Sequence, residues 1–409
     1  MRIVMMDIVS SLSRVETLVF LGFVLFGGLF FKIFIDLIWK PLTFYNAYTT
    51  QGIRGSSYRV LSGSVPEYRE LMRKAHAEPM KEISHDIVPR VMPHYHKWGQ
   101  KYGEIFFYWY GIHSRLVIAE PELMKEVLSN KFGYYDKPTP RPLILALLGR
   151  GLVFVNGLQW VKHRRIVSPA FNVDKLKGMV KRMAGCTSSM LEKWQEMVAQ
   201  EDFNGKEIDV QGEFGELTAD IISHTAFGSS FNEGKEVFEL QKVLQTMAAQ
   251  AERSVFIPGS QYFPTSKNRY AWRIDRRVRE ILNAVIKSRL QLVTKGATDV
   301  GYGNDLLGTM MTANKKELNS NQKYLRMTVD EIINECKTFF FAGHETTANL
   351  LNWALFLLAI NPEWQENLRN EVISVCGTDI PDADMLSRLK LMTMVIYETL
   401  RLYPPATMQ

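Results

Sequence analysis

An apolar run near the start of the chain constrains its fold most strongly. Residues 17–31 (TLVFLGFVLFGGLFF) carry no charge, and apolar side chains continue through residue 39. As helices, residues 17–31 would span about 22 Å and residues 17–39 about 34 Å, against a bilayer core of ~30 Å. The longer stretch admits Lys32 and Asp36, which lie four residues apart and can pair on one helix face. The run therefore predicts a transmembrane anchor at 17–39.

This anchor sets the predicted domain organisation. It is preceded by a tail at 1–16 and followed by a Gly- and Pro-containing linker at 40–65 and a large domain at 66–409. A cleaved signal peptide is the competing interpretation, but no small-x-small cleavage pattern follows the apolar run. Flanking positive charges are similar on the two sides, so they do not settle the orientation.

Three cysteines, Cys186, Cys336 and Cys376, are spread far apart along the chain. Their spacing fits neither a zinc site nor a disulfide framework, and so few thiols are typical of a reducing compartment. They favour a cytosolic location for the large domain. We expect none of them to ligate a metal.

Most of the chain beyond the linker has helical periodicity, which predicts a mainly α fold. Residues 104–120 are the exception, because two β-rich runs flank a Gly-Ile-His-Ser turn and predict a hairpin. The expected fold is mainly α with a small β-rich subdomain, preceded by one transmembrane helix. Clear helical patterns cover residues 121–131, 159–171, 174–199, 209–226, 235–252, 268–294, 328–359, 362–375 and 390–402.

The charge of the chain argues against nucleic-acid binding. The formal net charge is +6 over 409 residues, and no dense Lys/Arg stripe with interleaved aromatic residues is present. A mild positive charge fits either an ordinary basic surface or attraction to anionic lipid or an acidic partner.

Polar residues are concentrated in the middle of one strongly apolar helical stretch, FFFAGHETTANLLNWALFLL at 339–358. Placing Glu345, Thr346 and Thr347 inside a buried helix is costly unless they have partners or a function. Hydroxyls beside Gly343 can open the helix and present a hydroxyl and a carboxylate to a cavity, as proton delivery requires. On its own, the pattern is better explained by a core helix with a locally bonded threonine pair.

Two further patterns place charged or donor groups on helix faces. Glu398 and Arg401 are three residues apart near the end of an apolar helix, so we expect a partly buried ion pair. Trp160 and Arg164 are four apart, so an indole N–H and a planar guanidinium can reach one anionic group. Each pattern alone also fits an ordinary helix surface.

Taken in order, the three motifs AGHETT (342–347), ETLR (398–401) and WVKHR (160–164) resemble those of the cytochrome P-450 family, the haem-thiolate monooxygenases. The resemblance runs from about residue 50 to the end of the chain. The segments QGIRGSSYRVLSG (51–63) and FIPGSQYFPTSKNR (256–269) are similar to plant enzymes of the clan that includes secologanin synthase and cytokinin hydroxylase.

The resemblance implies both an activity and its cofactor. The expected reaction is hydroxylation of a lipophilic hormone, terpenoid or fatty acid by dioxygen. The cofactor would be haem b, and an NADPH-dependent reductase would supply the electrons. The protein would lie in the endoplasmic reticulum membrane, with the catalytic domain facing the cytosol. Implied site residues are Thr346 and Glu345 for proton delivery, Ala342 and Gly343 at the haem face, Trp160 and Arg164 at the propionates, and Glu398 with Arg401 as a structural pair.

The family's iron ligand is a cysteine in a Phe-x-x-Gly-x-Arg-x-Cys-x-Gly loop that follows the Glu-x-x-Arg helix. All three cysteines of this chain lie before that helix, and the chain ends at residue 409. We therefore expect a C-terminally truncated sequence that does not hold haem in the thiolate state as it stands. A non-catalytic, membrane-anchored helical relative is the alternative function, and reading the transcript beyond codon 409 distinguishes the two.

Overall fold

A computed structural model describes residues 19–130, 133–200, 206–228, 231–252, 254, 259–294, 302–316 and 326–406. The predicted tail, 1–16, and the first two residues of the predicted anchor lie outside this range. The chain divides into two compact units, and each is described by itself. Unit 1 comprises residues 1–135 and 250–262, and unit 2 comprises residues 136–249 and 263–409.

Unit 1 begins with one long helix that is apolar and long enough to cross a membrane. It spans Val19–Thr50, and its most apolar stretch is not buried by any other part of the structure. A π-helical turn, η1 (Ile35–Trp39), leads directly into α2 (Lys40–Thr50). The first part of the predicted linker, 40–65, is therefore helical, which differs from our expectation.

The charged residues in this helix pair differently from the prediction. Asp36 accepts a hydrogen bond from Lys40 at 2.7 Å, whereas we expected it to pair with Lys32. Both spacings are four residues, so periodicity alone could not choose between them.

The predicted hairpin is present and is extended by a third, very short strand. Strands β2 (Ile105–Tyr110) and β3 (His113–Ile118) pair antiparallel, and β1 (Arg54–Gly55) lies parallel to β2 in the order β1-β2-β3. Phe107 is fully buried because the ring of Tyr48 on α2 stacks on it at 4.8 Å. The other elements of unit 1 are α3 (Val65–Ala77), α4 (Val88–Val91), α5 (Pro93–Tyr102), α6 (Pro121–Ser129) and η3 (Ser260–Tyr262).

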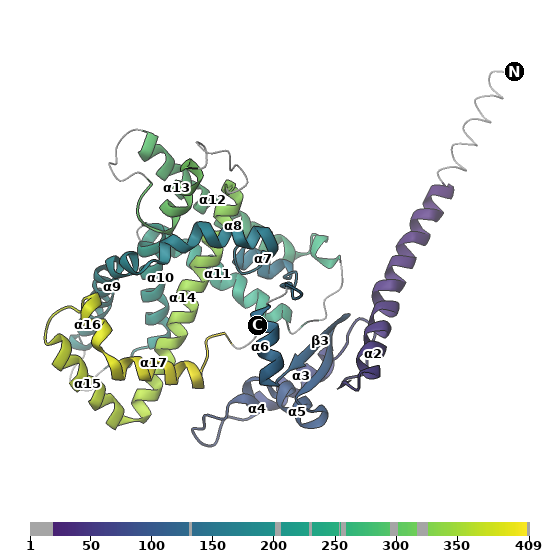
Figure 1. Ribbon diagram of the computed structural model, residues 1–409, viewed down its shortest axis with the longest axis horizontal. Helices are drawn as coiled ribbons and strands as arrows, with labels where there is room; N and C mark the ends of the chain where they lie inside the picture. Colours follow the sequence, from purple (N-terminus) through teal and green to yellow (C-terminus); the bar gives the residue numbers. More distant parts are fainter. Residues whose placement is uncertain are drawn as a thin grey trace. The chain divides into compact units, whose positions relative to one another are not determined.

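The described part of unit 2 is helical, and with the small sheet of unit 1 it confirms the predicted fold class. Its longest helix, α14 (Val329–Ile360), packs closely along α10 (Val210–Phe227), as Figure 1 shows. The remaining elements are α7 (Pro142–Leu148), α8 (Gly157–Val167), η2 (Ser168–Phe171), α9 (Val173–Ala199), α11 (Phe231–Glu252), α12 (Ser266–Thr294), α13 (Leu306–Lys316), α15 (Pro362–Cys376), α16 (Ala383–Arg388) and α17 (Lys390–Leu402).

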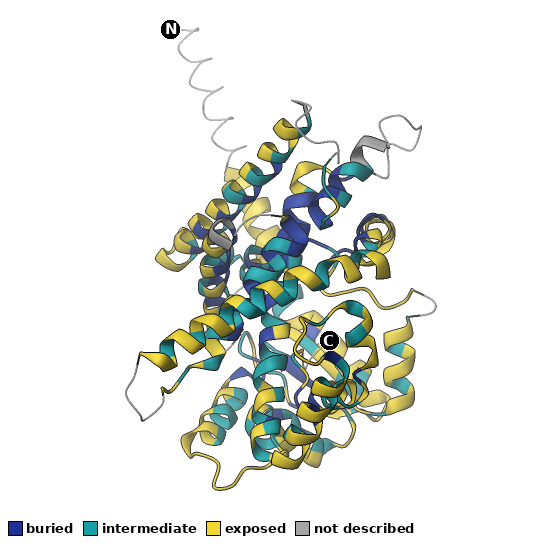
Figure 2. Ribbon diagram, turned by 90° about the vertical axis from the view of Figure 1, so that its left-hand side faces the viewer, coloured by how far each residue is buried: buried dark blue, intermediate teal, exposed yellow. Residues whose placement is uncertain are grey.

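The start and end of α14 follow from local sequence. The Thr328 hydroxyl accepts from the Glu331 N–H while the Glu331 carboxylate accepts from the Thr328 N–H, a reciprocal cap that satisfies two exposed donors. The helix ends at Ile360, two residues before Pro362, which begins α15. Between these limits α14 carries many of the buried residues, drawn in dark blue in Figure 2.

Candidate functional site

All eight residues of the predicted site lie in unit 2, on helices α8, α14 and α17. Figure 1 shows α8 near one end of α14 and α17 near the other. The contact between α14 and the end of α17 includes the ring of Trp353 on α14. This ring stacks parallel on that of Tyr403, the residue that follows α17, with centroids 3.9 Å apart. Helix α14 therefore connects the three motifs physically.

The hydroxyls of the threonine pair are bonded within α14 itself. The Thr346 hydroxyl donates to the carbonyl oxygen of Ala342 at 2.7 Å, and the Thr347 hydroxyl donates to that of Gly343 at 3.0 Å. The helix remains continuous from residue 329 to residue 360, so the expected opening is not seen. Thr346 is partly buried and Thr347 is exposed. Each hydroxyl keeps its lone pairs and can still accept a hydrogen bond from water.

Gly343 permits the close approach of α10 to α14. A Cβ atom at this position would lie 2.6 Å from Cδ1 of Ile222 on α10, far closer than packing allows. The space beside Gly343 is thus filled by Ile222, which differs from our expectation that Gly343 faces a cofactor. Ala342 and Thr346, one turn apart, share another face of the helix.

Glu345 is held by two amides. Its Oε1 accepts from Nε2 of Gln245 on α11 at 2.8 Å and from Nδ2 of Asn349 at 3.3 Å. The carboxylate is about one-third exposed, so it can exchange protons with solvent. A partly exposed carboxylate beside a hydroxyl on one helix is chemically suited to passing a proton inward.

His344, between the predicted residues, was not identified from the sequence. Its side chain is 3% exposed, Nδ1 lies 2.7 Å from the Phe340 carbonyl oxygen, and burial lowers its pKa. A neutral ring that donates from Nδ1 leaves Nε2, which is 3.9 Å from Glu345, as an acceptor. A histidine in a strongly apolar run was the available signal.

Trp160 and Arg164 lie on the exposed face of α8. Trp160 is 40% exposed and its ring lies below Nζ of Lys137, 5.8 Å from the centroid. The Arg164 guanidinium makes no hydrogen bond or ion pair within the part of the chain that the structure describes. The structure therefore brings together an indole and a free guanidinium one helical turn apart, as predicted from their spacing.

The opposite face of α8 is fixed to α14 by buried charges that the sequence analysis missed. His163 and Glu335 are both fully buried, and His163 Nδ1 contacts the Glu335 carboxylate. One turn earlier on α14, Glu331 forms an ion pair with Lys162 at 2.5 Å. The sequence signal for this contact was the presence of two carboxylates four residues apart on one predicted helix and of adjacent Lys and His residues on another.

The ion pair between Glu398 and Arg401 forms, but it is not buried. Two hydrogen bonds of 2.7 Å join the guanidinium to the carboxylate. The side chains are 53% and 67% exposed, which corrects our expectation of a partly buried pair. An apolar helix pattern predicts which face packs inward, and the two charged residues lie outside that face. An exposed pair of this kind contributes little stability.

Comparison with known proteins identifies the family. Residues 84–409 match the profile of the family described as cytochrome P450. The chain is 44% identical to cytochrome P450 709B1 of Arabidopsis thaliana over 381 residues, which are 92% of this chain and 72% of that protein.

Two further plant relatives support the assignment. Cytochrome P450 734A6 of Oryza sativa subsp. japonica is 42% identical over 92% of this chain and 70% of its own length. The cytokinin hydroxylase of Arabidopsis thaliana is 41% identical over 88% of this chain and 68% of its own length. With three motifs placed on adjoining helices and a match across most of its length, the chain belongs to the cytochrome P450 family.

Proposed function

We propose that this protein inserts one oxygen atom from dioxygen into a lipophilic small molecule, with Thr346 and Glu345 delivering protons. The family is a monooxygenase family that uses haem. The observation that carries the proposal is the Glu345-Thr346 pair on α14, where an accessible carboxylate and a partly buried hydroxyl follow the most buried stretch of the helix, residues 332–340.

The donors on α8 fit the carboxylates of a haem. Indole Nε1 of Trp160 and the guanidinium of Arg164 lie on the same exposed face, and the guanidinium has no acceptor in the described structure. A guanidinium matches a carboxylate with two parallel hydrogen bonds. We infer that these two residues bind the propionates and that Ala342 lies against the haem face.

None of the cysteines present is suited to ligate the iron. Cys336 lies on the buried face of α14, and burial raises its pKa, so its thiol stays protonated. Cys376 is also buried, at the end of α15, while Cys186 lies on α9. A thiolate ligand must be deprotonated and exposed to the iron. Bound haem would supply the activation of dioxygen, and the residues of α14 would govern the protons.

Proton delivery follows from the geometry of α14. Because the Thr346 hydroxyl donates to the Ala342 carbonyl oxygen, its lone pairs point away and can hold a water molecule. The Glu345 carboxylate, fixed by Gln245 and Asn349, can take a proton from solvent and pass it to that water. Thr346 is thus the binding group for the water, and Glu345 is the acid.

Replacing Thr346 by Ala tests this assignment in a haem-loaded form of the protein that includes the family's iron-ligating cysteine loop, with its reductase. We expect the haem spectrum to be retained, while NADPH is consumed with less product and more hydrogen peroxide. General acid catalysis contributes about 10²- to 10⁴-fold, so the loss of product per NADPH is expected to be large. The measurement is the ratio of product and peroxide to NADPH oxidised.

Thr347→Ala is the matched control, because Thr347 is the next residue, about 100° around the helix, and makes the same type of bond to the backbone. We expect this variant to keep normal coupling. If Thr347→Ala uncouples the reaction and Thr346→Ala does not, the assignment is shifted by one residue. If neither substitution changes coupling, the proton-delivery role is wrong.

The proposed substrate, partner and location rest on the family and on the N-terminal helix. The helix over residues 19–50 is compatible with a single-pass membrane anchor, which we place in the endoplasmic reticulum with the large domain facing the cytosol. Electrons would come from an NADPH-dependent reductase in the same membrane. Because one relative is named a cytokinin hydroxylase, hormones join terpenoids and fatty acids as the substrate classes to be tested.

A further inference from the structure

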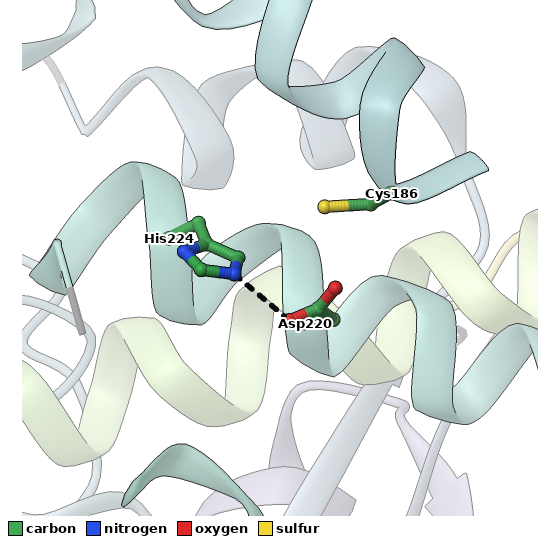
Figure 3. A group of neighbouring side chains, drawn as sticks. All are labelled: Cys186, Asp220 and His224. Carbon is green, nitrogen blue, oxygen red and sulfur yellow. Dashed lines mark ion pairs between the residues drawn. The ribbon is translucent and has the colours of Figure 1, made fainter. Parts of the chain in front are cut away.

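Three side chains with metal-binding atoms converge where α9 packs against α10, outside the residues assigned above. Cys186 comes from α9, and Asp220 and His224 come from successive turns of α10. One ligand atom from each lies within 4.8 Å of the others, and His224 Nε2 is 3.3 Å from Asp220 Oδ1. Figure 3 shows the Cys186 sulfur directed toward the Asp220-His224 pair.

We propose that Cys186, Asp220 and His224 form a zinc site that joins α9 to α10. Zinc bonds of about 2.0–2.3 Å place tetrahedral ligand atoms roughly 3.3–3.8 Å apart. The Asp220-His224 pair already meets this distance. Cys186 needs to approach by at most about 1 Å, which a small rotation of its side chain provides. The proposal does not depend on the monooxygenase function.

A poorly satisfied carboxylate oxygen supports the presence of a cation. Asp220 Oδ1 is shielded from solvent and has no well-aligned hydrogen bond with the described residues, although His224 Nε2 lies 3.3 Å away and the Cys186 thiol bonds to the same carboxylate. A buried acceptor without a donor is costly, and a bound metal ion removes that cost. The i, i+4 spacing of Asp220 and His224 fixes both ligands on one rigid helix face.

The ligand chemistry selects zinc over harder cations. A thiol, an imidazole and a carboxylate are zinc ligands, whereas magnesium and calcium prefer oxygen alone. Burial and the Asp220 carboxylate raise the pKa of the Cys186 thiol to about 11, so metal binding must displace a proton. The resulting thiolate and carboxylate balance the charge of the ion. All three side chains are only partly buried, which leaves the fourth position to water.

Arg182 competes with the metal for His224. Its Nη1 lies 3.3 Å from His224 Nδ1, which must then accept a hydrogen bond. A metal on Nε2 requires the neutral ring to carry its proton on Nδ1, and a protonated Nδ1 cannot accept from Arg182. Because Arg182 is an exposed residue, its side chain can turn into solvent when the metal binds. Removing Arg182 is therefore expected to strengthen binding.

Titration of the full chain in detergent micelles with Co²⁺, followed by displacement with Zn²⁺, tests the site. We expect one equivalent to bind with a thiolate-to-cobalt charge-transfer band and the visible bands of a tetrahedral ion. Cys186→Ser is expected to abolish the charge-transfer band. His224→Gln and Asp220→Asn are expected to weaken Zn²⁺ binding by more than the about 10- to 100-fold that loss of an outer-shell partner costs.

Two further variants and one alkylation-protection experiment serve as controls for this titration. Arg182→Gln should bind Zn²⁺ more tightly, and Cys376→Ser, which removes a buried thiol elsewhere, should bind like the unchanged chain. If the Cys186 variant fails to fold, alkylation of the unchanged chain decides, because Zn²⁺ should protect Cys186 from iodoacetamide. Absence of the thiolate band, its persistence in Cys186→Ser, or equal alkylation with and without Zn²⁺ would overturn the proposal.

Discussion

Arg164 and Arg165 are adjacent, exposed arginines whose surroundings differ. Neither guanidinium has a hydrogen bond or ion pair with the described residues. Only Arg164 shares a helix face with Trp160, because the two are four residues apart, whereas Arg165 is rotated by about 100° from Arg164. Arg164 is therefore positioned to donate to a ligand beside Trp160, whereas Arg165 is an ordinary charged surface residue.

Replacing Arg164 by Ala is predicted to weaken haem retention while leaving the stability of the haem-free chain within about 0.5 kcal/mol. A hydrogen bond to a charged group contributes about 1.5–3 kcal/mol, which corresponds to about 10- to 100-fold faster haem loss. Transfer of haem to an excess of an apo-haem protein measures that rate. Arg165→Ala is the control and should retain haem normally. Equal rates of haem loss from the two variants would show that Arg164 does not bind the haem.

Among the contacts between elements, the one between α8 and α14 depends on polar side chains with almost no exposure. His163 and Glu335 are 0% exposed, come from positions 172 residues apart and contact each other through His163 Nδ1. Removing one partner of a buried hydrogen bond leaves the other unsatisfied, whereas replacing both with apolar residues can be nearly neutral. This contact fixes the orientation of the helix that carries Trp160 and Arg164.

His163→Ala is predicted to lower the free energy of unfolding by about 1–3 kcal/mol, because Glu335 then stays buried without its hydrogen-bond partner. The combined change of His163→Leu with Glu335→Leu should recover most of that loss. Denaturant unfolding of the chain in detergent, followed by circular dichroism, measures both. A double variant as unstable as His163→Ala would show that the pair does not act as we describe.

Most of the long helices were predicted from the sequence, whereas α3 and α13, of 13 and 11 residues, were missed together with shorter helices. The helices expected at 328–359 and 390–402 correspond to α14 and α17, because the apolar pattern repeats over many turns. Helices α7 and α16, which span only seven and six residues, were missed because two turns carry too little periodicity.

In the candidate site, relations within one helix were predictable from the sequence, and contacts between helices were not. Spacing placed Trp160 and Arg164 on one face, because that relation lies within a single helix. It did not reveal that Gly343 packs against Ile222, or that Glu345 is bonded to Gln245. These contacts join different helices, and one sequence carries no direct signal for which helices meet.

For the molecule as a whole, we propose that the N-terminal helix determines where the chain resides. Its apolar residues from 19 onward are mostly exposed in the structure, and only a bilayer or another apolar partner would cover them. The charged pair formed by Asp36 and Lys40 lies toward the C-terminal part of this helix, where side chains can reach the membrane surface.

Deleting residues 17–39 is predicted to move most of the protein from the membrane pellet to the soluble fraction. Replacing the same residues with an unrelated apolar helix of equal length is the control and should restore pelleting, because the anchor requires only length and apolarity. Fractionation after a carbonate wash measures the distribution. Recovery of the intact chain in the soluble fraction would contradict the anchor.

We propose that the whole protein transfers one oxygen atom from dioxygen to a lipophilic molecule. Membranes that contain the haem-loaded protein and its reductase can be supplied with NADPH, isotopically heavy dioxygen and a panel comprising a fatty acid, a triterpenoid and a cytokinin. Mass spectrometry of the products then reports the origin of each new oxygen. We predict a hydroxylated product that carries one heavy oxygen atom and forms only with NADPH and the reductase. A product whose new oxygen comes from water, or one formed without reductase, would contradict the account.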